Sequence, residues 1–177
     1  MFLKTKIIKD LMCLEPYGIE FISKIIFMFT KRMFLVDETV IYENEPGDEL
    51  FYINNGKVGL FHKASKTFVC NCTNSQYFGE IAFFTGRKRT LTVKSRDYTD
   101  VQVLDFETFM SVAVDFPVAM NAYHDICDEL ITGSRNYSSF KVKCYVCKLE
   151  GHISVDCPGF ISIKSNLMKA KGNTNLT

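Results

Sequence analysis

The chain has 177 residues, 47% of them hydrophobic, which is enough for one domain or for one domain and a small module. Its formal net charge of +1 excludes a protein coated in basic surface for nucleic acid, although seven basic and two acidic residues follow from Arg135 onward. The longest apolar run, 19–29, is interrupted by charges and falls short of the roughly 20 residues of a membrane-spanning helix. The first residues lack the apolar core and cleavage site of a signal peptide, so we expect a cytoplasmic protein without direct membrane insertion.

The seven cysteines fall into two groups. In a reducing compartment, clustered cysteines indicate a metal site more than disulfides, and three of the seven lie between residues 144 and 157. The other four lie in apolar patterns, and we expect most of them to be buried as small hydrophobic side chains. These are Cys13, Cys70, Cys72 and Cys127.

Residues 1–33 are predicted to form N-terminal helices, separated at Pro16 and Gly18. In the second helix, apolar residues recur at steps of three and four, which gives one apolar stripe. Its members are Phe21, Ile22, Ile25, Ile26 and Phe29.

From residue 34 onward the pattern changes to short runs of Val, Ile, Phe and Tyr, cut by turn signals at a spacing of roughly ten residues. Such spacing predicts about eight strands in a sandwich or barrel. The turn Asn54-Asn55-Gly56 between two apolar runs favours a hairpin, because these residues tolerate a positive φ.

The helical period returns at Glu107, and Pro117 divides it into two helices, with Gly133 as the predicted cap of the second. The predicted fold class is therefore α+β, with an antiparallel, jelly-roll-like β-roll between N- and C-terminal helices. The roll and its last helix take residues 34–133, a linker takes 134–143, and the tail 159–177 is expected to be disordered.

The stretch FGEIAFFTGRKRTLTV, residues 78–93 and called the cassette below, carries the features of an anion site. Gly79 allows a turn, and the free N–H groups of one short helical turn after it suit an anion, which Arg89 can pair with. Glu80 repels a phosphate but accepts hydrogen bonds from hydroxyl groups. Phosphate and hydroxyl together indicate a sugar phosphate.

The cassette resembles the phosphate-binding cassette of cyclic nucleotide-binding domains, in which Phe-Gly-Glu precedes a short apolar turn and then Arg-Thr/Ala-Ala-x-Val. The spacing from Glu80 to Arg89 fits that pattern without gaps. VIYENEPGDELFYINNGKVGLF is similar to the family's Gly-Asp turn and Gly-Lys-Val hairpin, and FETFMSVAVDFPVAM is similar to the helix pair of its channel members. The resemblance covers about Leu3 to Thr132.

The resemblance implies a role for each matching residue of the cassette. Glu80 would bind the ribose 2′-hydroxyl of cAMP or cGMP, Arg89 would pair with the cyclic phosphate, and Thr90 would touch phosphate and purine. Members that lose the ligand usually lose the arginine or the glutamate, and both remain here, although a degenerate structural domain stays an alternative. The cradle would be completed by backbone groups of Gly79, Ile81 and Ala82.

Other implied contacts lie outside the cradle. The helix 118–132 would close over the base, with Leu130 or Ile131 as its apolar lid residue. Val69 and Leu91 would face the base or the core. Leu91 stands where the family usually has alanine, and its extra bulk beside the pocket would change base preference or weaken binding.

The segment 144–158 holds a pattern typical of a metal site. Three thiolates and one imidazole form a common tetrahedral set for structural zinc, and no ligand position remains for a water. The spacing resembles that of the zinc knuckle, with Tyr145 as its aromatic residue, although Lys148 stands in place of the usual glycine. The predicted ligands are Cys144, Cys147, His152 and Cys157.

Knuckles often bind single-stranded RNA through stacked aromatic and basic residues, here Tyr145 with Lys141, Lys143 and Lys148. A structural clip that docks the tail after the last helix is an equal interpretation. These alternatives stay open at the level of sequence.

The sequence predicts a non-enzymatic cyclic nucleotide sensor, because no nucleophile and base pair is evident. The cytoplasmic domain of a cation or potassium channel is the nearest resemblance, which would make channel transmembrane subunits or another protein its partners. A kinase regulatory subunit would need two tandem domains, and a bacterial-type transcription factor would need a helix-turn-helix where the knuckle lies. The remaining alternatives are an RNA-binding protein or a protein-docking module whose roll is only a scaffold.

Overall fold

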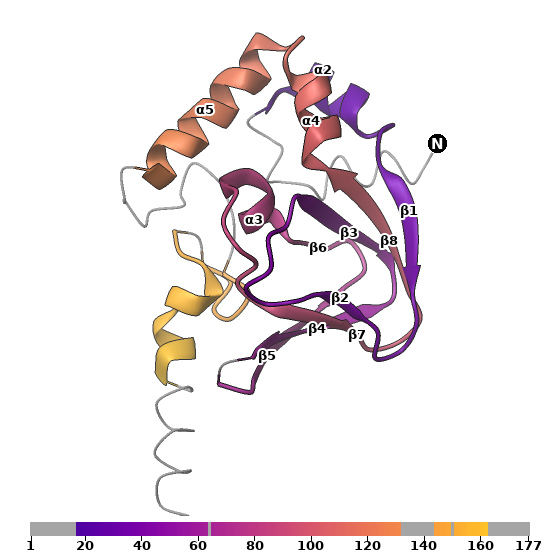
Figure 1. The fold of residues 1–177 in the computed structure, drawn as a ribbon, viewed down its shortest axis with the longest axis vertical. Helices are drawn as coiled ribbons and strands as arrows, with labels where there is room; N and C mark the ends of the chain where they lie inside the picture. The colour runs from indigo at the N-terminus through magenta and orange to yellow at the C-terminus, as the bar shows by residue number, and fades with distance from the viewer. Residues whose placement is uncertain (1–16, 64, 132–143, 150, 163–177) are drawn as a thin grey trace, which may run out of the picture.

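The computed structural model describes residues 17–63, 65–131, 144–149 and 151–162, and it confirms the predicted α+β jelly-roll (Figure 1). Eight strands form two four-stranded antiparallel sheets. The first sheet has the order β1-β8-β3-β6 and the second has the order β2-β7-β4-β5. The strands are β1 (Thr30–Phe34), β2 (Thr39–Ile41), β3 (Glu49–Asn55), β4 (Lys57–His62), β5 (Thr67–Thr73), β6 (Tyr77–Phe78), β7 (Thr92–Ser95) and β8 (Thr99–Asp105).

Strand β3 separates two hydrophobic clusters, because successive side chains of a strand point to opposite faces. Phe51 and Ile53 face the interior of the roll, where they pack with Leu60, Val93 and other side chains of both sheets. Leu50 and Tyr52 belong to a second cluster, which includes the apolar stripes of the helices.

Among the described residues, four helices pack with Leu50, Tyr52 and Leu104 of the first sheet. They are α2 (Ile19–Ile25), α3 (Glu80–Thr85), α4 (Phe106–Ala113) and α5 (Pro117–Ile131). Helices α2, α4 and α5 lie together at the top of Figure 1. Helix α4 follows β8 directly, and its N-cap Asp105 accepts a hydrogen bond from the N–H of Thr108. Within the described part of the chain, no helix combines the length and apolarity that crossing a membrane requires.

Two sequence predictions on the roll need correction. Residues 30–33 were expected to be helical, but they belong to β1, where they pair with β8 as an edge strand whose only buried residue is Phe34. The hairpin at Gly56 is also wrong, because β3 and β4 lie in different sheets. Gly56 has a φ of 108° and a Cβ there would lie 2.7 Å from the Thr99 Cα atom, so it forms a tight corner between the sheets.

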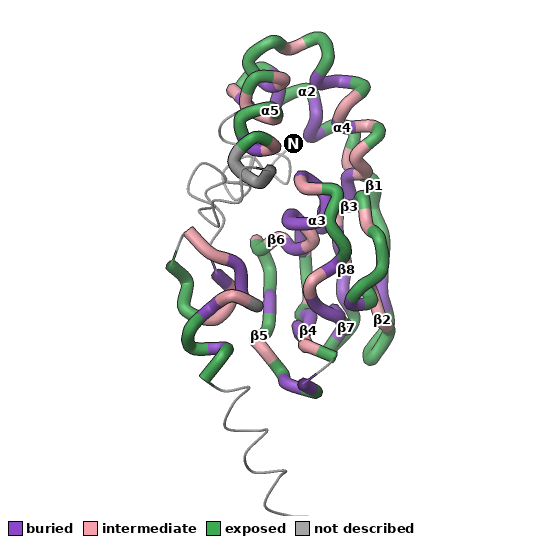
Figure 2. The backbone as a smooth tube through the Cα atoms, turned by 60° about the vertical axis from the view of Figure 1, so that its left-hand side comes forward, coloured by how far each residue is buried: buried purple, intermediate pink, exposed green. Residues whose placement is uncertain are grey.

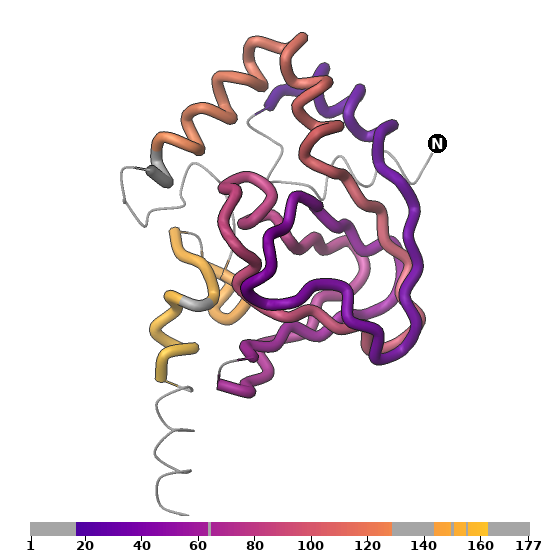
Figure 3. Tube along the Cα trace, viewed as in Figure 1, coloured from indigo at the N-terminus to yellow at the C-terminus, as the bar shows by residue number. Residues whose placement is uncertain are grey.

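The segment 144–162 packs beside β5 and β6, although it is far from them in sequence (Figures 2 and 3). It contains the 3₁₀ turn η2 (Ser154–Asp156) and ends in a helical turn at residues 158–162. The expectation of disorder from residue 159 is wrong for residues 159–162, because Phe160 is buried in a cluster that Val69 packs against, and its ring contacts His62 edge-on. The helix before Pro16, Cys13, Gly133, the linker 134–143 and the tail beyond 162 lie outside the described residues.

Candidate functional site

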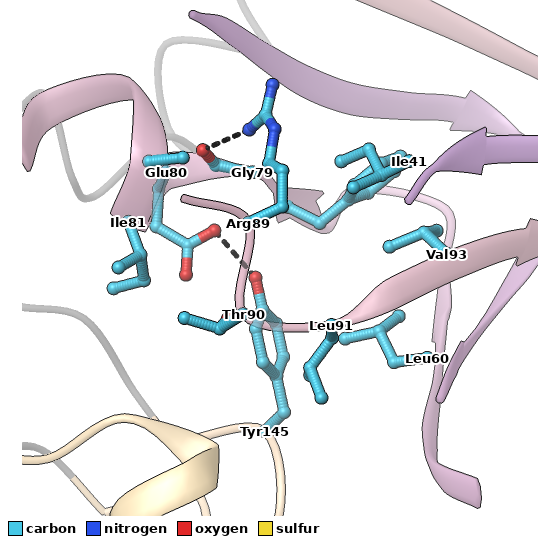
Figure 4. A pocket seen from close by; sticks show the side chains of 12 residues that line it. Ile41, Leu60, Gly79, Glu80, Ile81, Arg89, Thr90, Leu91, Val93 and Tyr145 are labelled. Carbon is cyan, nitrogen blue, oxygen red and sulfur yellow. Dashed lines mark hydrogen bonds between the residues drawn. The ribbon is translucent and has the colours of Figure 1, made fainter. Parts of the chain in front are cut away.

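The cassette folds as its local sequence predicts. Gly79 adopts the left-handed conformation, with a φ of 88°, and helix α3 begins at the next residue. The chain then returns through residues 86–91 to strand β7. As a result, the cassette forms much of the wall of one cavity inside the roll (Figure 4). That cavity is lined by Ile41, Leu60, Phe78, Gly79, Glu80, Ile81, Ala82, Arg89, Thr90, Leu91, Val93 and Tyr145.

Arg89 is buried, and its guanidinium lies against main-chain oxygens. Nη1 donates to the carbonyl of Gly79 at 2.8 Å, and Nη2 donates to the carbonyl of Glu49 at 2.9 Å. Burial lowers the pKa of Arg89, while the carboxylates of Glu49, Glu80 and Asp48 oppose that change. Arginine stays protonated in proteins, so the cavity wall contains a permanent positive charge.

Glu80 is 1% exposed, and its carboxylate points into the cavity (Figure 4). Burial raises the pKa of this carboxyl to about 6, although hydrogen bonds and the charge of Arg89 partly offset the effect. A buried carboxylate needs a donor, because an unpaired polar group in a low-dielectric interior costs about 1–3 kcal/mol or more. The donor in this structure comes from outside the roll.

That donor is Tyr145, which sequence reasoning placed in the metal segment as a stacking group for RNA. Its hydroxyl oxygen lies 2.7 Å from Oε2 of Glu80 and 3.3 Å from the carbonyl oxygen of Tyr77. A phenol has one proton to donate, and the shorter contact to a carboxylate takes it. Tyr145 also packs with the cluster that fills the roll. Its side chain is therefore part of the cavity.

The remaining predicted ligand residues divide into three cases. Leu91 lines the cavity and is buried, and the other predicted ligand residues of the cassette line the same cavity. Val69 is not among the lining residues; it packs against the cluster that fills the roll and also against the cluster of Cys144, Cys157 and Phe160. Leu130 and Ile131 lie at the end of α5, but their side chains fall outside the described residues.

The four predicted metal ligands come together. The ligand atoms of Cys144, Cys147, His152 and Cys157 all lie within 4.8 Å of one another. Sulfur ligands at 2.3 Å around a tetrahedral zinc ion would be separated by about 3.8 Å. The donor set and its spacing therefore fit zinc.

The local conformation prepares this cluster for a metal. Burial raises the pKa of the Cys157 thiol, but N–H groups of Phe160 and Gly159 and a hydrogen bond with His152 outweigh it and lower this pKa to about 7. A thiol of that kind is readily available as thiolate near neutral pH. Lys148 has a φ of 65°, so the turn keeps the left-handed conformation although a glycine is missing.

Comparison with known protein families agrees with this geometry. Residues 31–115 match the family model described as cyclic nucleotide-binding domain. Residues 142–158 match the family model described as zinc knuckle. Both resemblances predicted from the sequence are thereby confirmed.

Several curated proteins are similar to the first of these segments. Potassium/sodium hyperpolarization-activated cyclic nucleotide-gated channel 1 of Homo sapiens is 26% identical over 106 residues, which are 60% of this chain and 12% of the channel. Channel 3 of Homo sapiens is 24% identical over 118 residues, or 66% of this chain and 15% of the channel. Channel 2 of Mus musculus is 28% identical over 102 residues, or 56% of this chain and 12% of the channel. The chain thus spans only a small part of the length of the curated relatives it matches.

Proposed function

We propose that this chain, whose residues 31–115 match the cyclic nucleotide-binding domain family and whose residues 142–158 match the zinc knuckle, is a non-enzymatic sensor of cAMP or cGMP. One observation carries the proposal: seven cassette residues expected to contact the nucleotide line a single cavity. They are Gly79, Glu80, Ile81, Ala82, Arg89, Thr90 and Leu91.

The chemistry of the cavity supports a cyclic nucleotide over other anions. Arg89 supplies a positive charge for the phosphate, and Glu80 supplies an acceptor for a ribose hydroxyl. Apolar side chains such as Leu60 and Val93 form the rest of the wall, which suits a purine. For Arg89 to reach a ligand, its guanidinium exchanges the Gly79 and Glu49 carbonyls for phosphate oxygens.

The proposal extends to the protein's setting. The similar curated proteins are named as cyclic nucleotide-gated channels, so we propose that this chain acts in the cytoplasm as a regulatory domain or as a relative of one. Channel subunits or another protein are then its partners. Structural zinc in the knuckle fits the three thiols and one imidazole and serves folding rather than chemistry.

Calorimetric titration of the full chain with cAMP and with cGMP tests the function. We expect binding of at least one nucleotide, and a loss of about tenfold or more in affinity for Arg89→Ala and for Glu80→Ala, since a charged hydrogen bond contributes about 1.5–3 kcal/mol. Lys94→Ala, on the same strand as the end of the cassette but outside the cavity, is the matched control. Unchanged affinity in both site variants would overturn the assignment of this cavity.

A further inference from the structure

We propose that the zinc knuckle is a tethered occupant of the nucleotide cavity, so that docking of Tyr145 and binding of a cyclic nucleotide exclude each other. This inference rests on the proposed function, because it concerns the regulation of the same cavity. It is carried by three observations: the hydrogen bond of Tyr145, the space that remains, and the contacts that hold the knuckle in place.

The hydroxyl of Tyr145 takes the position that the proposed function reserves for a ribose hydroxyl. It donates to Oε2 of Glu80 at 2.7 Å, across 65 residues of chain (Figure 4). The phenol oxygen occupies Oε2 and Tyr145 lines the cavity, so a ribose hydroxyl cannot reach Oε2 while Tyr145 is docked. A nucleotide that binds Glu80 therefore displaces the phenol.

The volume of the cavity leads to the same conclusion. With Tyr145 in place, about 30 Å³ remains open, which is room for water. Pockets for small ligands measure roughly 300–1,000 Å³. The Tyr145 ring lies beside Thr90 and Leu91 with its hydroxyl toward Glu80 (Figure 4), so its departure opens the space that a purine ribose phosphate requires.

The knuckle is held by more than its tyrosine. Phe160 is 2% exposed and packs against Val69, with its ring centroid 5.3 Å from that of His62. Ile153 joins the hydrophobic cluster of the helices. Tyr145, Ile153 and Phe160 thus contact the roll and the helices together, and the docked arrangement needs all three on one folded unit.

Zinc holds that unit together. Tyr145 lies between the ligands Cys144 and Cys147, and a module of this size rarely keeps its fold without its metal. Removal of zinc therefore releases Tyr145 and opens the cavity. Because coupling between two sites is reciprocal, a bound nucleotide weakens the affinity of the knuckle for zinc to the same degree.

The test compares the zinc-loaded full chain with Tyr145→Ala, Tyr145→Phe and the control Tyr98→Ala, a 51% exposed tyrosine outside the cavity. Titration with cAMP and cGMP is expected to show an affinity about tenfold or more higher for Tyr145→Ala than for the parent chain. The reason is that no tyrosine side chain then occupies the cavity, so the state that can bind nucleotide is no longer a minor one. Tyr145→Phe keeps the ring and loses the donor, so it is expected to lie between them, and Tyr98→Ala is expected to match the parent.

A second measurement determines the affinity of the chain for zinc. Competition with a metallochromic indicator gives the zinc affinity with and without saturating nucleotide. We expect nucleotide to weaken zinc binding in the parent chain and to leave it unchanged in Tyr145→Ala.

The outcomes separate this inference from the proposed function. Equal nucleotide affinity in the parent chain and Tyr145→Ala overturns the occupancy by Tyr145 and leaves the sensor function standing. Absence of binding in all four proteins, with unchanged circular dichroism, overturns the sensor function and this inference with it. If the zinc affinity of the parent chain is the same with and without nucleotide, the coupling between the zinc site and the nucleotide cavity is overturned.

Discussion

Gly47 and Arg89 pack so closely that a methyl group on Gly47 would overlap the Nε atom of Arg89. On the other side of the guanidinium, a Cβ on Gly79 would lie 2.8 Å from Nη1. Two glycines therefore provide the slot in which Arg89 reaches the carbonyls of Gly79 and Glu49. The absence of a side chain at Gly47 leaves the space that the charged guanidinium of Arg89 occupies.

Gly47→Ala is expected to displace Arg89 and to lower the free energy of unfolding by about 1–3 kcal/mol, the usual cost of overpacking. Urea unfolding followed by circular dichroism measures it. Gly159→Ala is the matched control, because its Cβ would meet only ordinary contacts at 3.6 Å and beyond, and it should change stability by less than about 0.5 kcal/mol. An equal loss of unfolding free energy in the two variants would contradict the claim that Gly47 provides space for Arg89.

The pKa of Glu80 predicts a pH dependence of stability. Burial raises this pKa from 4.5 to about 6, so the folded protein holds the proton more tightly than the unfolded chain does. The resulting stabilisation is complete below about pH 4.5 and is lost as the pH rises through 6. It amounts to about 2 kcal/mol, because a tenfold difference in proton affinity between the folded and unfolded states corresponds to about 1.4 kcal/mol.

Glu80→Gln removes this titration and keeps an oxygen that accepts from Tyr145. The variant should therefore gain about 2 kcal/mol relative to the parent chain between pH 4.5 and 7, measured by urea unfolding at several pH values. Other titrating groups cancel in the difference. Parallel stability profiles for the two proteins would show that Glu80 does not titrate in this range.

The metal cluster predicts one zinc ion per chain. Cys144→Ser and Cys157→Ser each remove a thiolate from the set and are expected to abolish zinc retention, as measured by native mass spectrometry. Cys70→Ser is the control, because Cys70 is a partly buried cysteine outside the ligand set. Retained zinc in both ligand variants would reject the tetrahedral assignment.

Lys148 has a left-handed backbone conformation, which costs an L-residue about 1–2 kcal/mol and a glycine almost nothing. Lys148→Gly is therefore expected to tighten zinc binding about two- to fivefold, after the greater freedom of glycine in the unfolded chain is subtracted. Indicator competition measures this affinity. Lys148→Ala, which keeps the unfavourable φ, should show no gain.

The cassette could be predicted from sequence because its residues are contiguous. Gly79, the helical turn of α3 and the strand β7 bring Glu80 and Arg89 near each other by local geometry. Gly47 and the Glu49 carbonyl then fix the guanidinium. The hairpin at Gly56 was predicted wrongly for the opposite reason. A positive φ is compatible with a hairpin or with a corner between sheets, and only the distant partners of β3 and β4 decide between them.

Tyr145 shows where reasoning from local patterns ends. Its aromatic character and its place between two metal ligands were evident in the sequence. Its contact with Glu80, 65 residues earlier in the chain, depends on the shape of a cavity built by both sheets and α3, and no spacing rule predicts that shape.

The pairing of β1 with β8 has a consequence for how this protein is made. Thr30 donates from its side chain to the carbonyl of Val103, 73 residues later, and β8 lies between β1 and β3. On a ribosome the first sheet therefore lacks one of its two inner strands until synthesis has passed Asp105. Folding that depends on such distant partners is slow, and the charged side chains of Glu80 and Arg89 stay in contact with water until the sheet has formed.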